Sequence, residues 1–256
     1  ITRHQITHSS EPGSRRLVVT GEDISLKMDL EEKRMTYPNQ ADSSIVTSIL
    51  SHYGTYGIQP KVTTTKDQPD EKQRVPAQGG TDLGYVRMLA ERNGFIFYIE
   101  PTTTIETTDA YWGPTQREGT AQPPLSLNMG PYTNVESLDF GFDALLPAKP
   151  SVSILDVGQR AIQEVSTPES LHKTLTSQPT EAWRITLPSA SARLNRSQAE
   201  LLALASMMES ADAVTCSGEL NTVSYGYVLR ARRLVGVRGA GQNYNGDYFV
   251  KQVTHR

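Results

Sequence analysis

The chain has 256 residues and a mass of 28.2 kDa, long enough for one large domain or two smaller ones with a buried core. Only 37% of the residues are hydrophobic, and no stretch approaches the about 18 consecutive apolar residues of a membrane-spanning helix, so no membrane insertion is expected. With 25 Lys and Arg against 28 Asp and Glu, the net charge of -3 predicts no nucleic-acid specificity.

The first predicted elements are two strands and a short helix. Residues 16–21 are rich in β-branched side chains, and residues 24–30 alternate apolar and polar positions, so they predict two strands joined as a hairpin. Residues 42–54 carry apolar side chains at helical spacing. Asp42 or Ser43 is the expected N-cap of this helix, and Gly54 is its expected end.

The clearest local pattern spans residues 78–99. Thr81 or Asp82 caps a predicted helix, and Asn93-Gly94 ends it. Residues 95–99 then form a strand rich in aromatic and β-branched side chains. The side chains that this pattern assigns to the buried face of the helix are Leu83, Val86, Leu89 and Ala90.

The rest of the chain is mainly predicted strand. Residues 195–211 form the strongest predicted helix, residues 158–180 are expected to be a surface loop, and Asn245-Gly246 is a typical hairpin dipeptide. The predicted strands are 103–107, 125–128, 134–142, 151–156, 213–220, 225–233, 234–238 and 248–254. The order of strands, an α/β segment and further strands predicts an α+β fold that is mainly β.

Several short motifs have a possible chemistry that their surroundings do not support. Residues 239–244 begin like a glycine-rich phosphate loop, but the third glycine is missing and no helix follows, so a turn is expected. His4 and His8 have no third ligand nearby for a metal ion. Ser170 and Lys173 match the SxxK spelling of acylating hydrolases without any partner motif.

The remaining candidates are charged clusters and one thiol. Asp67, Asp70 and Glu71 lie in a polar run, where solvation keeps carboxylates from acting as an acid–base pair. Residues 230–238 concentrate arginines without interleaved aromatics, which favours a solvated strand or a protein interface over a nucleic-acid platform. Cys216 is the single cysteine and is expected in the core. The sequence therefore predicts no catalytic residue, no metal site and no cofactor.

Four stretches in chain order resemble the baseplate hub proteins of contractile phage tails and related injection systems, namely the late control D type of tail protein and the hub portion of type VI secretion spikes. Residues 17–26 are similar to the strand that precedes the family's insertion, and 42–50 to its first short helix. Residues 78–99 resemble its helix and aromatic strand, and 235–255 its closing hairpin. Family members usually have further residues before the first stretch.

The resemblance implies a structural role without enzymatic activity. It implies a homotrimer that joins the tail tube protein to the central spike protein, surrounded by baseplate wedge or sheath-associated proteins, in a virion or injection particle assembled in the host cytoplasm. It also implies tail-tube-like β-barrels on both sides of an α/β insertion. Residues 1–40 are expected to belong to a first barrel, 41–124 to the insertion, and 125–256 to a second barrel with the helix at about 195–211.

Two alternatives from other functional classes stay open at this point. One alternative is a cell-wall glycan hydrolase carried on the same kind of particle, and the other is a glycan-binding module. A glycan-binding module needs an exposed aromatic platform, yet aromatics make up only 7% of the residues, and Trp112 and Trp183 do not lie in a cluster. The structural hub is therefore the leading interpretation.

Overall fold

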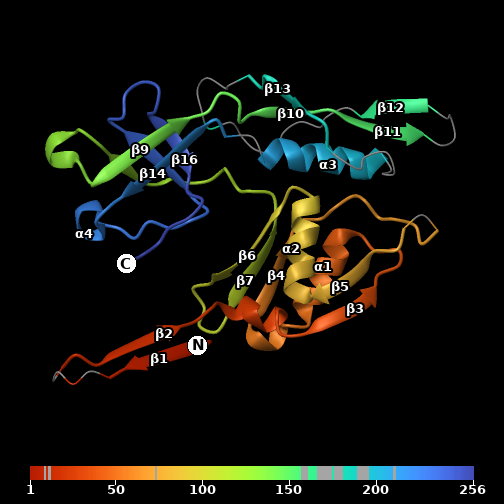
Figure 1. The fold of residues 1–256 in the computed structure, drawn as a ribbon, viewed down its shortest axis with the longest axis horizontal. Coiled ribbons are helices and arrows are strands. Elements are labelled where there is room, and N and C mark those ends of the chain that lie inside the picture. The colour runs from red at the N-terminus through yellow and green to blue at the C-terminus, as the bar shows by residue number, and fades with distance from the viewer. Residues whose placement is uncertain are drawn as a thin grey trace. The chain divides into compact units, whose positions relative to one another are not determined.

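The computed structural model describes residues 1–8, 10, 13–72, 74–156, 161–165, 175, 181–188, 196–209 and 212–256. The chain divides into two compact units. Unit 1 comprises residues 1–91 and 96–113, and unit 2 comprises residues 92–95 and 114–256. Strands outnumber helices in the described residues, and the fold is α+β and mainly β, as the sequence predicts (Figure 1).

Unit 1 combines an arm of two strands, two small sheets and two α-helices (Figure 1). Its described elements are β1 (Arg3–Thr7), β2 (Arg16–Thr20), the 3-10 helix η1 (Ile24–Met28), β3 (Glu32–Thr36), α1 (Asp42–Ser51), η2 (Gly54–Tyr56), β4 (Ile58–Val62), β5 (Ala77–Thr81), α2 (Asp82–Arg92), β6 (Ile96–Pro101) and β7 (Thr108–Gly113). Strand β7 lies between β4, which is parallel to it, and β6, which is antiparallel. Strand β3 pairs with β5, and β1 pairs with β2.

Both helices of unit 1 pack on the sheet β4-β7-β6. Helix α1 contacts β4, and the indole of Trp112 on β7 donates a hydrogen bond of 3.2 Å to the carbonyl oxygen of Val86 in α2. Both helices are amphipathic, and their apolar faces contribute most of the core between these elements. The buried members of this core include Met28, Ile45, Val46, Leu50, Ile58, Leu83, Val86, Leu89, Ala110 and Trp112.

The predicted unit at residues 78–99 is confirmed. The hydroxyl of Thr81 accepts a hydrogen bond from the Gly84 amide at 3.2 Å, so Thr81 caps α2. The left-handed Gly94, with φ of 65°, separates the helix from β6. Leu83, Val86, Leu89 and Ala90 are all buried, as their spacing predicts.

Three expectations for unit 1 are wrong at the level of local structure. Residues 24–28 form η1 because the Asp23 carboxylate accepts a hydrogen bond from the Ser25 amide at 2.8 Å, which starts a helical turn. Strand β2 pairs with β1 instead of residues 24–30. The expected strand 103–107 is a turn, in which Glu106 is left-handed with φ of 65°.

The ends of α1 also differ from the prediction. Ala41 occupies the N-cap position without any side-chain hydrogen bond, while the Ser43 hydroxyl accepts a hydrogen bond from the Thr65 amide at 3.1 Å. The helix ends at Ser51 before Gly54, which begins η2. The left-handed glycine of this turn is Gly57, with φ of 77°.

Unit 2 is built from one three-stranded sheet and several strand pairs (Figure 1). Its described elements are β8 (Gln122–Ser126), η3 (Gly130–Tyr132), β9 (Ser137–Phe142), β10 (Ala148–Pro150), β11 (Val152–Asp156), β12 (Ala161–Val165), β13 (Arg184–Thr186), α3 (Arg196–Glu209), β14 (Val214–Glu219), α4 (Thr222–Tyr225), β15 (Leu234–Arg238) and β16 (Gly246–Phe249). The sheet has the order β16-β15-β8, and the pairs are β14-β9, β11-β12 and β10-β13.

Unit 2 contains two separate apolar clusters. Strands β8 and β15 contribute Leu125, Val235 and Val237 to the first, which also contains Val135 and Tyr225. The second joins α3 to β11 and β12, and its members are Val152, Ile154, Val165, Ala199 and Ala203. The helix predicted for residues 195–211 is thus confirmed as α3, which packs through its alanines.

Three expectations for unit 2 are wrong. Strand β16 ends at Phe249, so residues 250–254 of the strand expected at 248–254 are not in a strand. Residues 225–233 are not a strand, because α4 ends at the left-handed Gly226 and the chain then turns through Arg232, which also has a positive φ of 62°. Part of the loop expected at residues 158–180 is the strand β12, and most of that segment lies outside the described residues. The hairpin predicted by Asn245-Gly246 is present, since β15 and β16 pair antiparallel.

The described strands do not close into barrels. Barrel closure requires every strand to pair on both sides. In this part of the chain, only β7 and β15 have two neighbours, and the other paired strands each have one open edge. The domain boundaries expected at residues 40 and 124 stay a prediction, although β3, within residues 1–40, pairs with β5 from the expected insertion.

Candidate functional site

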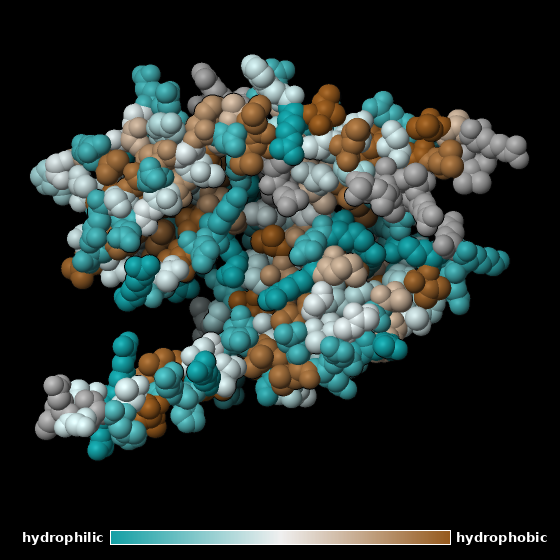
Figure 2. Space-filling view, viewed as in Figure 1, coloured by the Kyte–Doolittle hydropathy of each residue, from teal (hydrophilic) through white to brown (hydrophobic). Residues whose placement is uncertain are grey.

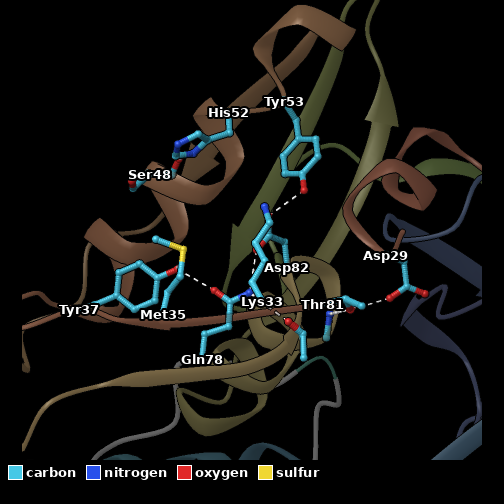
Figure 3. A network of polar contacts seen from close by, with 12 residues as sticks. Asp29, Lys33, Met35, Tyr37, Ser48, His52, Tyr53, Gln78, Thr81 and Asp82 are labelled. Atoms are coloured by element: carbon cyan, nitrogen blue, oxygen red, sulfur yellow. Dashed lines mark hydrogen bonds and ion pairs between the residues drawn. The ribbon is translucent and has the colours of Figure 1, made fainter. Parts of the chain in front are cut away.

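Unit 1 holds a buried group of polar side chains around Asp82 (Figure 3). We call Lys33, Tyr37, Tyr53, Gln78 and Asp82 the Asp82 cluster. The register of β3 on β5 sets Lys33 opposite Gly80 and Met35 opposite Gln78, so Lys33 and Gln78 point to the same side of the strand pair. Asp82 is the first residue of α2, and Tyr53 follows the end of α1. The cluster therefore joins four elements.

Short hydrogen bonds link the members of this cluster. The Lys33 Nζ and the Tyr53 hydroxyl each donate to Asp82 Oδ2 at 2.7 Å. Gln78 Nε2 donates to Asp82 Oδ1 at 2.7 Å, and its Oε1 accepts from the Tyr37 hydroxyl at 2.6 Å. Both carboxylate oxygens of Asp82 thus have partners, and the side chains of this aspartate and Gln78 are buried.

The cluster keeps Asp82 ionised. Burial opposes its charged form, but hydrogen bonds from Lys33, Gln78 and Tyr53 together outweigh burial and hold the pKa of Asp82 below its ordinary value. The hydrogen bond to Asp82 raises the pKa of Lys33, and burial together with the same carboxylate raises the pKa of Tyr53. The N-terminus of α2 also favours a negative charge at this position.

This arrangement stabilises structure and exposes no reactive group. Asp82 is only 3% exposed and already accepts three hydrogen bonds, so it has no open approach for a substrate proton. The sequence indicated Asp82 only as a possible helix cap. The sequence signal for this cluster was the spacing of Gln78 and Asp82. Lys33 and Tyr53 lie too far from Asp82 along the chain for any spacing to identify them as its partners.

Replacing Asp82 with asparagine is expected to lower the free energy of unfolding at pH 7 by about 1–3 kcal/mol, because the hydrogen bonds to a charged acceptor are lost. The pKa of Asp82 is lower in the folded state. Its charge therefore stabilises the fold above the unfolded pKa of about 4, and this contribution is lost as the pH falls through the folded pKa. The difference between wild type and variant should shrink below about pH 4.

Urea denaturation at pH 7 and at successively lower pH measures this difference. Glu91→Gln is the matched control, since it removes a carboxylate from an exposed position of the same helix. This control should change the free energy of unfolding by less than about 0.5 kcal/mol. If the free energy of unfolding of Asp82→Asn differs from that of wild type by the same amount down to pH 3, the loss comes from altered side-chain packing and not from the missing charge.

Unit 2 contains a second ion-pair group. The guanidinium of Arg117 binds the Asp212 carboxylate through two hydrogen bonds of 2.6 and 2.8 Å, and Lys251 Nζ lies 3.3 Å from the same carboxylate. Arg117 also lies over the ring of Phe249, 5.9 Å from its centroid. Burial opposes the charge of Asp212, but the hydrogen bonds and charge of Arg117 dominate and lower its pKa. The group ties the segment before β8 to the segments that flank β14 and β16.

The structure does not assemble the sequence's carboxylate and histidine candidates into a site. Asp67 pairs with Arg74 at 2.9 Å, and the carboxylate of Asp70 accepts from the Lys72 amide at 2.9 Å. His4 and His8 are exposed near the N-terminus of the chain. Among the described residues, no three His, Cys, Asp or Glu side chains come together to hold a metal ion.

The other sequence candidates occupy ordinary structural positions. Cys216 on β14 is half-buried and not the core residue that the sequence predicts, because its strand packs only partly against other elements. Partial burial still raises the pKa of its thiol, which disfavours the nucleophilic thiolate. Residues 239–244 form the connection between β15 and β16, as a turn requires. Arg238 is the arginine of the 230–238 run that lies in a strand. The SxxK residues 170–173 lie outside the described residues.

The two tryptophans have opposite environments. Trp112 is fully buried and Trp183 is 77% exposed, so they do not form a shared stacking platform. A shallow groove beside α1 and β4 is lined by Ser43, Ser44, Thr47, Ser48, Val62 and Thr64, and it carries neither charge nor aromatic rings. In the described residues, no helix has the length and apolar character needed to cross a membrane.

Comparison with known proteins gives structural relatives among the solved structures and a partial family match. The crystal structure of the tail protein from Neisseria meningitidis MC58 superposes with a TM-score of 0.59 at 14% identity, covering 96% of this chain and 71% of that chain. The family model of the Alg8 N-terminal domain matches residues 1–115. No curated protein matches the chain. The chain therefore shares its fold with a tail protein.

Proposed function

We propose that the chain is a structural component of a tail, and specifically the hub that joins the tail tube to the central spike. The observation that carries this proposal is the fold shared with the Neisseria tail protein over 96% of the chain. The order of the four sequence stretches that resemble hub proteins supports the same interpretation. In this proposal, the protein acts at the baseplate of a virion or injection particle and performs no catalytic step.

The assembly proposed for this role is a homotrimer. Tail tubes of this class are built from sixfold rings and spikes are threefold, so a hub between them must match both symmetries. Three copies that each offer β-rich segments on both sides of an α/β segment provide such a match. A head-to-tail interface closes into a ring when the successive rotations between neighbouring copies add up to a full turn. Its neighbours would be the tail tube protein, the central spike protein and baseplate wedge or sheath-associated proteins.

Native mass spectrometry of the isolated full-length protein tests the proposal, together with a cryo-EM map of the particle that contains it. We expect three copies of the chain around one axis, between the tube and the spike. A ring of six copies, or a single copy in the assembled particle, would contradict the proposed hub.

A further inference from the structure

The strands β1 and β2 form an arm that lacks a core of its own. All ten residues of the two strands are exposed. A two-stranded ribbon is marginally stable alone in water and needs a third strand or another packing partner. In the described part of the chain, neither strand pairs with any strand besides the other. The outer edges of β1 and β2 therefore offer backbone groups for pairing with another strand.

The arm has two chemically different faces. Arg3 lies opposite Thr20 and Thr7 opposite Arg16, which puts both arginines on one face. The other face carries apolar side chains with large exposed fractions: Ile6 (54%), Leu17 (61%) and Val19 (48%). Figure 2 shows hydrophobic and hydrophilic residues side by side along the arm. An arm of this kind fits a partner ribbon that is apolar on one side and acidic on the other.

The ribbon of β9 and β14 in unit 2 has these properties. Its inner face carries Leu138 and Phe140, and the ring of Phe140 lies 4.9 Å from that of Tyr244. On its outer face, Asp139 lies opposite Ser217 and Glu219 opposite Ser137, and all four residues are exposed. Neither strand contains a Lys or Arg. This ribbon also has two open edges within the described residues.

We propose that the β1-β2 arm of one copy adds edge to edge to the β9-β14 ribbon of a second copy. The two ribbons then form a four-stranded sheet. Its apolar side continues from Leu138 and Phe140 to Ile6 and Leu17, and its charged side sets the arginines of the arm beside Asp139 and Glu219. Main-chain hydrogen bonds supply affinity, and the opposite charges fix register and partner choice.

A second copy is the occupant that the two ribbons favour. The arm and the acidic ribbon are different surfaces of one chain, and a contact between them uses each surface once per copy. Such a head-to-tail contact closes into a ring when the successive rotations between copies add up to a full turn. The inference names the interface of the proposed hub and rests on that function for the ring of three.

Charge reversal and charge exchange test the pairing in the full-length protein. Arg3→Glu with Arg16→Glu should raise the dissociation constant between copies by at least about tenfold, and so should Asp139→Arg with Glu219→Arg. Combining all four substitutions should restore the wild-type constant to within about threefold, because opposite charges face each other again. Arg34→Glu with Lys61→Glu is the control: it reverses the same number of charges on exposed strand residues elsewhere in unit 1 and should leave association unchanged.

A cross-linking measurement keeps the test independent of folding losses. In a Cys216→Ser background, one tagged copy carries Arg16→Cys and a differently tagged copy carries Asp139→Cys. A short bis-maleimide should join the two tags. Restoration by exchange and cross-links between tags support the pairing. Unchanged association after reversal, or cross-links only within one copy, overturn it.

The mass of the assembly separates this inference from the proposed function. Three copies whose association ignores the charge substitutions would leave the hub standing and overturn the ribbon pairing. A dimer whose association is weakened by charge reversal and restored by charge exchange would support the ribbon pairing and contradict the threefold hub. A wild-type chain that stays monomeric at all concentrations would overturn both.

Discussion

Replacing Trp112 with alanine is expected to lower the free energy of unfolding by about 3–5 kcal/mol, the range for removing a large buried aromatic side chain. Trp112 is the largest of the fully buried side chains described, and it lies where β7 meets α2. Its indole also donates the hydrogen bond to the Val86 carbonyl, so the variant loses packing and a buried hydrogen bond together. Because β7 is the central strand of its sheet, the loss affects both neighbouring strands.

Trp183→Ala is the matched control for this prediction. The chain has only two tryptophans, and Trp183 is 77% exposed, so its removal should change the free energy of unfolding by less than about 0.5 kcal/mol. Urea denaturation followed by circular dichroism measures both variants. The Trp183→Ala protein retains Trp112 as a fluorescence probe, whose emission should shift to longer wavelength on unfolding. Equal losses in the two variants would contradict the assignment of Trp112 to the core.

Helices were predictable where a local pattern determines them. In α2, the Thr81 cap, the apolar spacing and Gly94 lie within a few residues of one another, and each has the predicted role. Helix α3 is equally local, because alanines and leucines favour a helix wherever the chain places them. Helical hydrogen bonds join residues four apart, so the sequence contains both partners of each bond in one window.

Strands were less predictable because short polar side chains competed with the extended backbone. Residues 24–30 alternate like a strand, yet the Asp23 carboxylate binds the Ser25 amide and starts a helical turn. Asn221 acts in the same way at α4, where its side chain accepts from the Val223 amide at 2.9 Å. Such local bonds were visible in the sequence only as residue types that also occur in turns.

Long-range pairing was beyond the sequence patterns. Strand β4 pairs parallel with β7, which places Ile58 beside Thr108, and β8 pairs parallel with β15. No spacing rule selects these partners, because loop lengths and side-chain packing decide them together. The Asp82 cluster has the same origin: Lys33 reaches Asp82 only after β3 has paired with β5. The sequence could therefore predict elements better than sites.

Helix α2 permits a stringent test of which side faces inward, because two neighbouring residues have opposite environments. Leu89 is fully buried, whereas Met88, one residue earlier, is 41% exposed. Both side chains are long and unbranched at Cβ and both favour helices, so alanine at either position changes helix propensity little. A difference between the two variants therefore reports burial alone.

Leu89→Ala is expected to lower the free energy of unfolding by about 2–5 kcal/mol, since it removes buried methyl groups and leaves a cavity. Leu83 and Val86 of the same helix are also buried. Side chains in a close-packed core relax only partly into such a cavity. Met88→Ala should lose less than about 1 kcal/mol, because much of its side chain already contacts water. Equilibrium denaturation of both variants decides the orientation. A loss below about 0.5 kcal/mol for Leu89→Ala, or a larger loss for Met88→Ala, would mean that α2 turns a different face to the core.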